Sequence, residues 1–284
     1  MGSACFPWWA GGSVAKPAPR SPASPAVQRL VVRYAKRGKM RFASHRDVAR
    51  AFERGVRRAG LPIAYSAGFT PHPKISYAGG APTGVASEAE YLSLALTSRQ
   101  AAAEVRERLN AVLPDGIDVI DVMEDAEADG RSSATSSDAL APTASVSPAD
   151  SEASGSLPSG NSGSFSGLEA SEWRVELPGV KPEAAERAVA GFLALREAPV
   201  ERRTDKVVRH LDARAAVVEM DVIAADPDDC AILRMVVLNT APAVRPEDVL
   251  TALRGGHGIA PSSSPLTTRL AQGSRTSLTG KNLS

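Results

Sequence analysis

The chain has 284 residues, with 33 Lys and Arg against 32 Asp and Glu, so its net charge of +1 neither favours nor excludes a polyanionic partner. Its two cysteines, Cys5 and Cys230, form no CxxC spacing, which excludes an iron–sulfur cluster or a cysteine-held zinc site within the chain. No stretch reaches the roughly 18 consecutive apolar residues of a transmembrane helix, and the first residues lack the pattern of a signal peptide. We therefore expect a cytoplasmic protein without membrane contact, bound metal or cofactor.

Residues 1–27 are rich in Pro, Ala, Gly and Ser, which predicts a disordered leader. The next residues predict a strand at about 29–36, a helix after Ser44, strands within about 74–80 and 88–96, a helix within about 99–113, and a final strand from about 117. Ser44 and Asp47 have the spacing of a helix capping box, and Gly60 is typical of a helix end. The β-α-β-β-α-β order over 28–125 predicts a ferredoxin-like domain.

Residues 126–170 have the low-complexity composition of a disordered acidic linker. A second module follows over 171–260, with a strand, a helix near Pro182, two strands and a helix that opens at Pro246. Its element order resembles that of the first module. The predicted fold class is therefore α+β, with two tandem ferredoxin-like domains, and residues 261–284 are expected to form a flexible tail.

Positive charge is concentrated in the first module. From Arg29 to Tyr77 there are 12 Lys and Arg against two acids, a local net charge of +10. Guanidinium groups neutralise phosphates and aromatic rings stack on unpaired bases, so the Arg-rich helix and the loop "LPIAYSAGFTPHPKISYAGG" at 61–80 predict a surface for RNA. The alternative is that the rings belong to the core and the arginines are merely solvated. The candidate RNA- or ligand-binding residues are Arg41, His45, Arg46, Arg50, Arg54, Arg57, Tyr65, Ser66, Phe69, His72, Lys74 and Glu90.

Catalytic candidates are confined to His45, His72 and Tyr65, with Lys74 nearby in the sequence. A histidine at a helix N-terminus and another between two prolines could act as general acid and base in metal-independent RNA cleavage. For each histidine alone, a structural hydrogen bond is the simpler interpretation. Glu88 and Glu90 could bind a metal, but pairing of Glu90 with an arginine is the favoured interpretation.

The basic segment "VERRTDKVVRHLDARAAV" at 200–217 of the second module is either a second phosphate-binding hairpin or a solvated loop.

The first module resembles the radical-SAM-linked family of uncharacterised domains, whose members carry a pattern like SH-x-D-x-x-R, LP-x-x-YS-x-GF-x-PHP and S-x-x-EY. The matching positions are Ser44, His45, Asp47, Arg50, Leu61, Pro62, Tyr65, Ser66, Gly68, Phe69, Pro71, His72, Pro73, Gly84, Ser87, Glu90 and Tyr91. The segments "RRTDKVVRHLDAR" and "TRLAQG" of the second half also resemble this family.

Members of this family stand alone or extend the C-terminus of cobalamin-binding radical SAM proteins. The resemblance therefore implies an accessory module for a radical SAM enzyme that acts on RNA, and it supplies no catalytic residue. The leading hypothesis is a non-catalytic RNA-binding or substrate-presenting module whose RNA is tRNA or rRNA. The alternatives are a metal-independent endoribonuclease of ferredoxin-like fold and a protein–protein adaptor for a partner enzyme.

Overall fold

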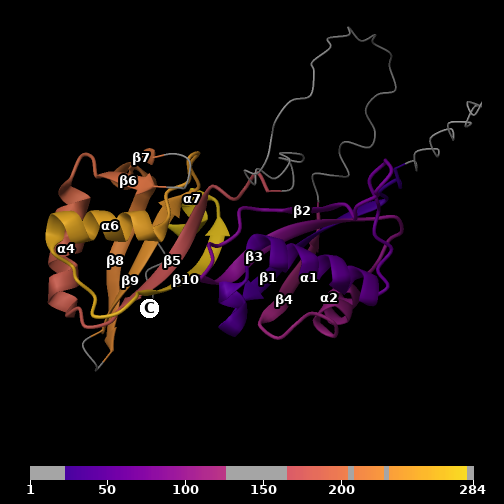
Figure 1. Cartoon of the computed structure of the whole chain (residues 1–284), viewed down its shortest axis with the longest axis horizontal. Coiled ribbons are helices and arrows are strands. Elements are labelled where there is room, and N and C mark those ends of the chain that lie inside the picture. Colours follow the sequence, from indigo (N-terminus) through magenta and orange to yellow (C-terminus); the bar gives the residue numbers. More distant parts are fainter. Residues whose placement is uncertain (1–22, 126–164, 204–207, 227–229, 280–284) are drawn as a thin grey trace, which may run out of the picture.

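The computed structural model describes residues 23–125, 165–203, 208–226 and 230–279. Within these ranges the chain is a mixed α+β protein built around one eight-stranded, mostly antiparallel sheet (Figure 1). The predicted leader up to residue 22, the predicted linker over 126–164 and Cys5 lie outside the described residues. Within those ranges, none of the helices combines the length and the apolar character needed to span a bilayer.

The N-terminal half contributes four strands and two helices. The strands are β1 (Gln28–Lys36), β2 (Ile75–Tyr77), β3 (Ala86–Leu96) and β4 (Ile117–Glu124), and the helices are α1 (His45–Arg58) and α2 (Ala102–Asn110), with a 3-10 turn at Gly38–Phe42. The strand order is β4-β1-β3, with β2 paired to β3, and every pairing is antiparallel. The predicted capping box is present in α1, where Ser44 accepts from the backbone N–H of Asp47 and the Asp47 carboxylate accepts from that of Ser44.

The C-terminal half repeats this element order with additions. It comprises β5 (Ala170–Leu177), α4 (Pro182–Ala194), β6 (Pro199–Arg203), β7 (Val208–Asp212), α5 (Ala213–Ala216), β8 (Val217–Asp226), β9 (Cys230–Leu238), α6 (Pro246–His257), β10 (Leu266–Gly273) and α7 (Arg275–Leu278). The main strands lie in the order β10-β5-β9-β8. The basic segment considered above as a phosphate-binding hairpin or a loop forms the separate two-stranded β6–β7 hairpin.

The two halves share their sheet. Strand β10 pairs in parallel with the start of β3, at Thr268↔Ala86 and Arg269↔Ser87, and antiparallel with β5 on its other side. The prediction of a flexible tail from residue 261 is therefore wrong for Leu266–Gly273, which joins the halves; residues 280–284 lie outside the described residues. We call this pairing of β10 with β3 the joint between the halves. The sequence predicts two domains separated by a linker and does not predict the joint.

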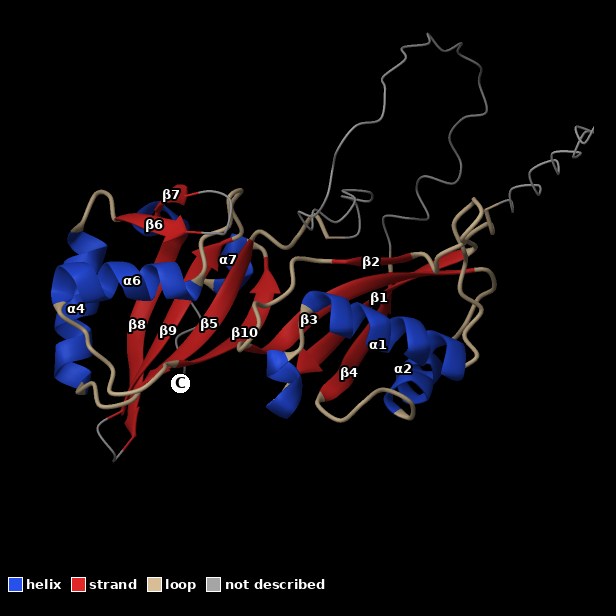
Figure 2. Ribbon diagram, in the orientation of Figure 1, coloured by secondary structure: helices blue, strands red, loops and turns tan. Residues whose placement is uncertain are grey.

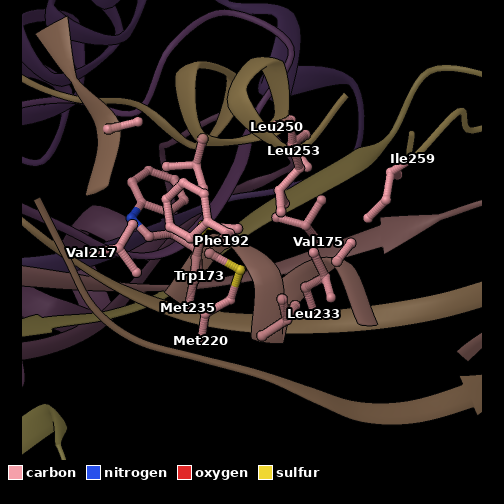
Figure 3. Close-up of a cluster of buried hydrophobic side chains, with 14 of the residues drawn as sticks. Trp173, Val175, Phe192, Val217, Met220, Leu233, Met235, Leu250, Leu253 and Ile259 are labelled. Atoms are coloured by element: carbon pink, nitrogen blue, oxygen red, sulfur yellow. The ribbon is translucent and has the colours of Figure 1, made fainter. Parts of the chain in front are cut away.

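Each half has its own hydrophobic core. In the N-terminal half α1 buries one apolar stripe, with Val48, Phe52 and Val56, against leucines of β1 and β3. In the C-terminal half Trp173, Phe192 and Met235 pack with residues of α4, α6 and the sheet (Figure 3). Figure 2 shows α1 and α6 on the same face of the sheet, one over each half.

Candidate functional site

Helix α1 presents a row of arginines to solvent. Its apolar stripe faces the sheet, and the opposite face carries four exposed arginines at successive turns: Arg46, Arg50, Arg54 and Arg57. None of the ion pairs within the described residues involves these four side chains. Like charges at i,i+4 spacing each cost about 0.2–0.5 kcal/mol of helix stability. Asp47, in the first turn, interacts electrostatically with Arg50 and Arg54, so the row is a positive surface that one nearby carboxylate offsets only in part.

The loop after α1 is stiff and projects an aromatic ring. Tyr65 and Pro73 form an isolated bridge, and between them Ser66 and His72 exchange two hydrogen bonds. The backbone N–H of Ser66 donates to the His72 carbonyl at 2.9 Å, and the backbone N–H of His72 donates to the Ser66 hydroxyl at 3.0 Å. At the tip, the Phe69 side chain is 65% exposed. Two hydrogen bonds at the base of the loop thus stiffen the turn that carries Phe69.

Other predicted binding residues of this segment have structural contacts. Tyr65 packs partly against the N-terminal core. The Nζ of Lys74 donates to the Ser24 carbonyl at 3.1 Å, and the Nε of Arg41 donates to the Gly84 carbonyl at 2.7 Å. His72 is exposed. The Phe69 ring, His72 and the arginine row therefore remain as the solvent-facing features of the predicted surface.

The two candidate catalytic histidines do not meet. The loop of His72 lies at the end of β3, because Ala64 and Lys74 bond to Ala95. His45 lies near Glu90, five residues back along β3, which corresponds to about 17 Å of extended strand. The sequence hypothesis that the two act together as acid and base is not supported by this placement.

His45 itself occupies a partly buried position in the first turn of α1. Its ring meets the Tyr77 ring edge-on, with centroids 5.2 Å apart, and its Nε2 is buried without a hydrogen-bond partner in the described structure. Burial lowers the pKa of His45, and the nearby Lys36 adds to that effect while Glu90 opposes it. The imidazole is therefore held in its neutral form near neutral pH.

Glu90 pairs with an arginine, as favoured from the sequence, but the arginine comes from the other half of the chain. The Nη1 of Arg269 donates to the Glu90 carboxylate at 3.0 Å, and both side chains are buried. Glu88 pairs instead with Arg37, so the two carboxylates do not converge. No cluster of metal-ligating side chains is found in the described ranges.

The backbone of the segment Gly79–Gly84 forms hydrogen bonds with charged side chains. Its backbone accepts from Arg269 at Gly79 and from Lys36 at Ala81 and Pro82, and the Ala81 N–H donates to Glu90 at 3.1 Å. Gly80 lies close to His45, since a Cβ built there would sit 3.1 Å from the His45 Nδ1. A side chain at position 80 would therefore press on that ring, which would have to shift by a few tenths of an ångström.

A pocket of about 390 Å³ lies where the halves meet. One wall is formed by residues between Ala78 and Pro82 of the N-terminal half, and the other lining residues come from the C-terminal half. The guanidinium of Arg269 lies 4.5 Å above the Trp173 ring at its inner side. The lining residues are Ala78, Gly79, Gly80, Pro82, Phe165, Leu168, Trp173, Val237, Asn239, Thr240, Ala243, Val244, Arg245, Arg269 and Gln272.

The pocket and its two arginines are not among the features predicted from the sequence. Arg269 and Gln272 lie in "TRLAQG", the segment noted for its family resemblance, and both cross the joint, since the Gln272 side chain donates to the Ala89 carbonyl at 2.5 Å. That resemblance was the available signal. Arg245, at the mouth of the pocket, had no signal beyond its place before Pro246.

Comparison with known proteins places the chain among bacterial sequences of one family. The model of the family described as "Uncharacterized protein conserved in bacteria (DUF2344)" matches residues 29–142 and 150–246. No curated protein matches the chain. Among solved structures, a chain of "Crystal Structure of a Cbf5-Nop10-Gar1 Complex" is similar with a TM-score of 0.41 and 10% identity, over 84% of this chain and 47% of that one. The chain thus spans about half the length of that structure.

Proposed function

Since the chain belongs to this bacterial family, we propose a function from its own site: a non-catalytic RNA-binding or substrate-presenting module that works with a separate enzyme. The observation that carries the proposal is the row of exposed arginines on α1 without ion-pair partners in the described structure, close in sequence to a stiff loop with an exposed ring. Such a row supplies phosphate contacts, and an exposed ring supplies a stacking platform for a base.

The proposed architecture is a pair of ferredoxin-like units joined edge to edge. Its support is the strand order, which is β4-β1-β3-β2 in the first half and β10-β5-β9-β8 in the second, each with two helices between strands. The partner enzyme that the sequence resemblance implies is a radical SAM protein, and this stays a prediction.

The test compares RNA binding by two variants, each of which loses three positive charges from a different surface. We expect Arg50→Ala/Arg54→Ala/Arg57→Ala to weaken binding of a structured tRNA at low salt by at least about tenfold, because three phosphate contacts are lost. The matched control is Lys181→Ala/Arg187→Ala/Arg196→Ala, which removes three exposed cations at α4 and leaves the arginine row intact. Equal affinity of the arginine-row variant and the wild type would refute the proposal and leave the adaptor hypothesis in its place.

The second candidate, a metal-independent endoribonuclease, is favoured by one observation. The buried Nε2 of His45 lacks a hydrogen-bond partner in the described structure, and the ring is held neutral, as a general base requires. RNA cleavage in EDTA that disappears in His45→Ala and persists in His72→Ala would establish it. Intact RNA after incubation with the wild type would exclude it.

A further inference from the structure

The junction pocket combines an apolar wall with two positive charges. Phe165, Leu168, Trp173 and Val244 provide the apolar surface, and the charged lining residues within the described ranges are Arg245 and Arg269, with no acid among them. Asp248 lies nearby, but it is paired with Arg202. A pocket of about 390 Å³ falls in the range of small-molecule sites, and its lining favours a ligand that is flat and apolar at one end and anionic at the other.

Arg269 has an unused donor at the inner side of this pocket. Its Nη1 donates to Gly79 and Glu90, whereas its Nε is buried and has no partner in the described structure. The side chain is 8% exposed. A buried donor left without an acceptor costs about 1–3 kcal/mol, so a rearrangement that gives the Nε an acceptor, for example one brought by a ligand, would be favoured.

Arg245 provides the second charge, at the mouth. Its side chain is only partly desolvated, and it forms no ion pair within the described structure. Desolvation lowers the pKa of Arg245, and the neighbouring guanidinium groups of Arg202 and Arg209 lower it further, although Asp248 opposes this. Helix α6 begins at the next residue, and its positive N-terminal end adds to the same potential. An anion at the mouth would relieve this crowding of positive charge.

We propose that this pocket binds one nucleotide, with its phosphate on Arg245 and Arg269 and its base against the apolar wall. The inference rests on the RNA-binding function proposed above and names the part of the RNA that is recognised. Gly80, in the pocket wall, lies close to His45 at the start of α1, and Arg46, the first member of the arginine row, is the next residue of that helix. The same chemistry belongs to a free mononucleotide and to a nucleotide within an RNA strand.

Trp173 reports on this pocket directly. The protein contains three tryptophans, at 8, 9 and 173, so Trp8→Phe/Trp9→Phe in the full chain leaves Trp173 as the sole emitter. This variant is titrated with AMP, CMP, GMP, UMP and inorganic phosphate while Trp173 emission is followed. We expect a saturable change with at least one mononucleotide, and an affinity at least about tenfold weaker when Arg245→Gln is added. Arg254→Gln, which removes an arginine paired with Glu247 on α6, is the control and should bind as before.

The outcomes distinguish a free mononucleotide from a nucleotide within RNA, and they distinguish failure of the nucleotide site from failure of the proposed RNA binding. If RNA competes with the bound mononucleotide, the site takes a nucleotide of the RNA; if RNA does not compete, it takes a free nucleotide. No response of Trp173 to any of the four mononucleotides at millimolar concentration would overturn the nucleotide site, as would equal affinity for inorganic phosphate alone. Failure of the RNA-binding proposal would give a different result, which is unchanged RNA affinity in Arg50→Ala/Arg54→Ala/Arg57→Ala.

Discussion

At the residue scale, the Glu90–Arg269 ion pair connects two segments that are 179 residues apart in the chain. Both side chains are buried, and the carboxylate also accepts from the Ala81 N–H. Desolvation lowers the pKa of Arg269, and Glu90 opposes this change. The buried charge of Arg269 therefore depends on its carboxylate partner for compensation within the joint.

Removing the carboxylate should expose that dependence. We expect Glu90→Leu to reduce the free energy of unfolding by about 3–5 kcal/mol, because Arg269 is left as an uncompensated buried charge. The double variant Glu90→Leu/Arg269→Met should be more stable than Glu90→Leu, since it removes both charges. Urea denaturation followed by circular dichroism measures both values. A loss below about 1 kcal/mol in Glu90→Leu would contradict this account of the pair.

His45 should make stability depend on pH. Its pKa is lowered in the folded protein, so between the folded value and the ordinary value of 6.5 the unfolded chain binds more protons. This contribution is complete above pH 6.5 and is lost as the pH falls through 6.5 toward the folded pKa. We expect the stability of the wild type to fall more on acidification from about pH 7.5 to 5 than that of His45→Gln. Parallel pH profiles for the two proteins would be the contrary result, and His72→Gln, at an exposed histidine, is the control.

At the element scale, α1 was predictable and β10 was not. The helix has a capping pair, an apolar stripe at helical spacing and a terminal glycine, all local signals. In β10 the inward positions are Thr267, Arg269 and Gln272, which are buried because they face the joint between the halves. A half-buried strand is recognised from alternating apolar and polar residues. Because the buried positions of β10 are polar, this alternation is missing and the sequence predicts a flexible tail.

The cap of α1 can be tested separately from its arginines. Ser44→Ala removes the hydroxyl that accepts from Asp47 N–H, and we expect a loss of about 0.5–2 kcal/mol in the free energy of unfolding. Ser44→Thr should recover most of the loss, because threonine keeps a hydroxyl that can accept from the Asp47 N–H and donate to the Asp47 carboxylate. A Ser44→Ala variant with the urea midpoint of the wild type would show that the cap does not stabilise this helix.

At the scale of the whole molecule, the shared sheet makes the halves dependent on each other. The strand pairing of β3 with β10, the Glu90–Arg269 pair and the Gln272–Ala89 hydrogen bond all cross the joint. The arginine row could be predicted because it lies within one helix. The pocket could not, because its walls come from segments far apart in the sequence, and only Arg269 of its two arginines lies in a segment marked by the family resemblance.

The halves should therefore unfold together. In Trp8→Phe/Trp9→Phe, Trp173 reports on the C-terminal half, while circular dichroism reports on both. We expect the two urea transitions to coincide, because disruption of either half breaks the joint. A separation of the two midpoints would show that the joint contributes little to stability.

The central claim, that the arginine row of α1 binds RNA phosphates, is tested most directly by the salt dependence of binding. The measurement is the slope of log K against log salt concentration for a structured tRNA, with the integrity of the RNA read in the same tubes. The account predicts a steep slope without cleavage in the wild type, and a slope reduced by about 2 to 3 in Arg50→Ala/Arg54→Ala/Arg57→Ala. Equal slopes in the two proteins, or no RNA affinity at any salt concentration, would contradict it.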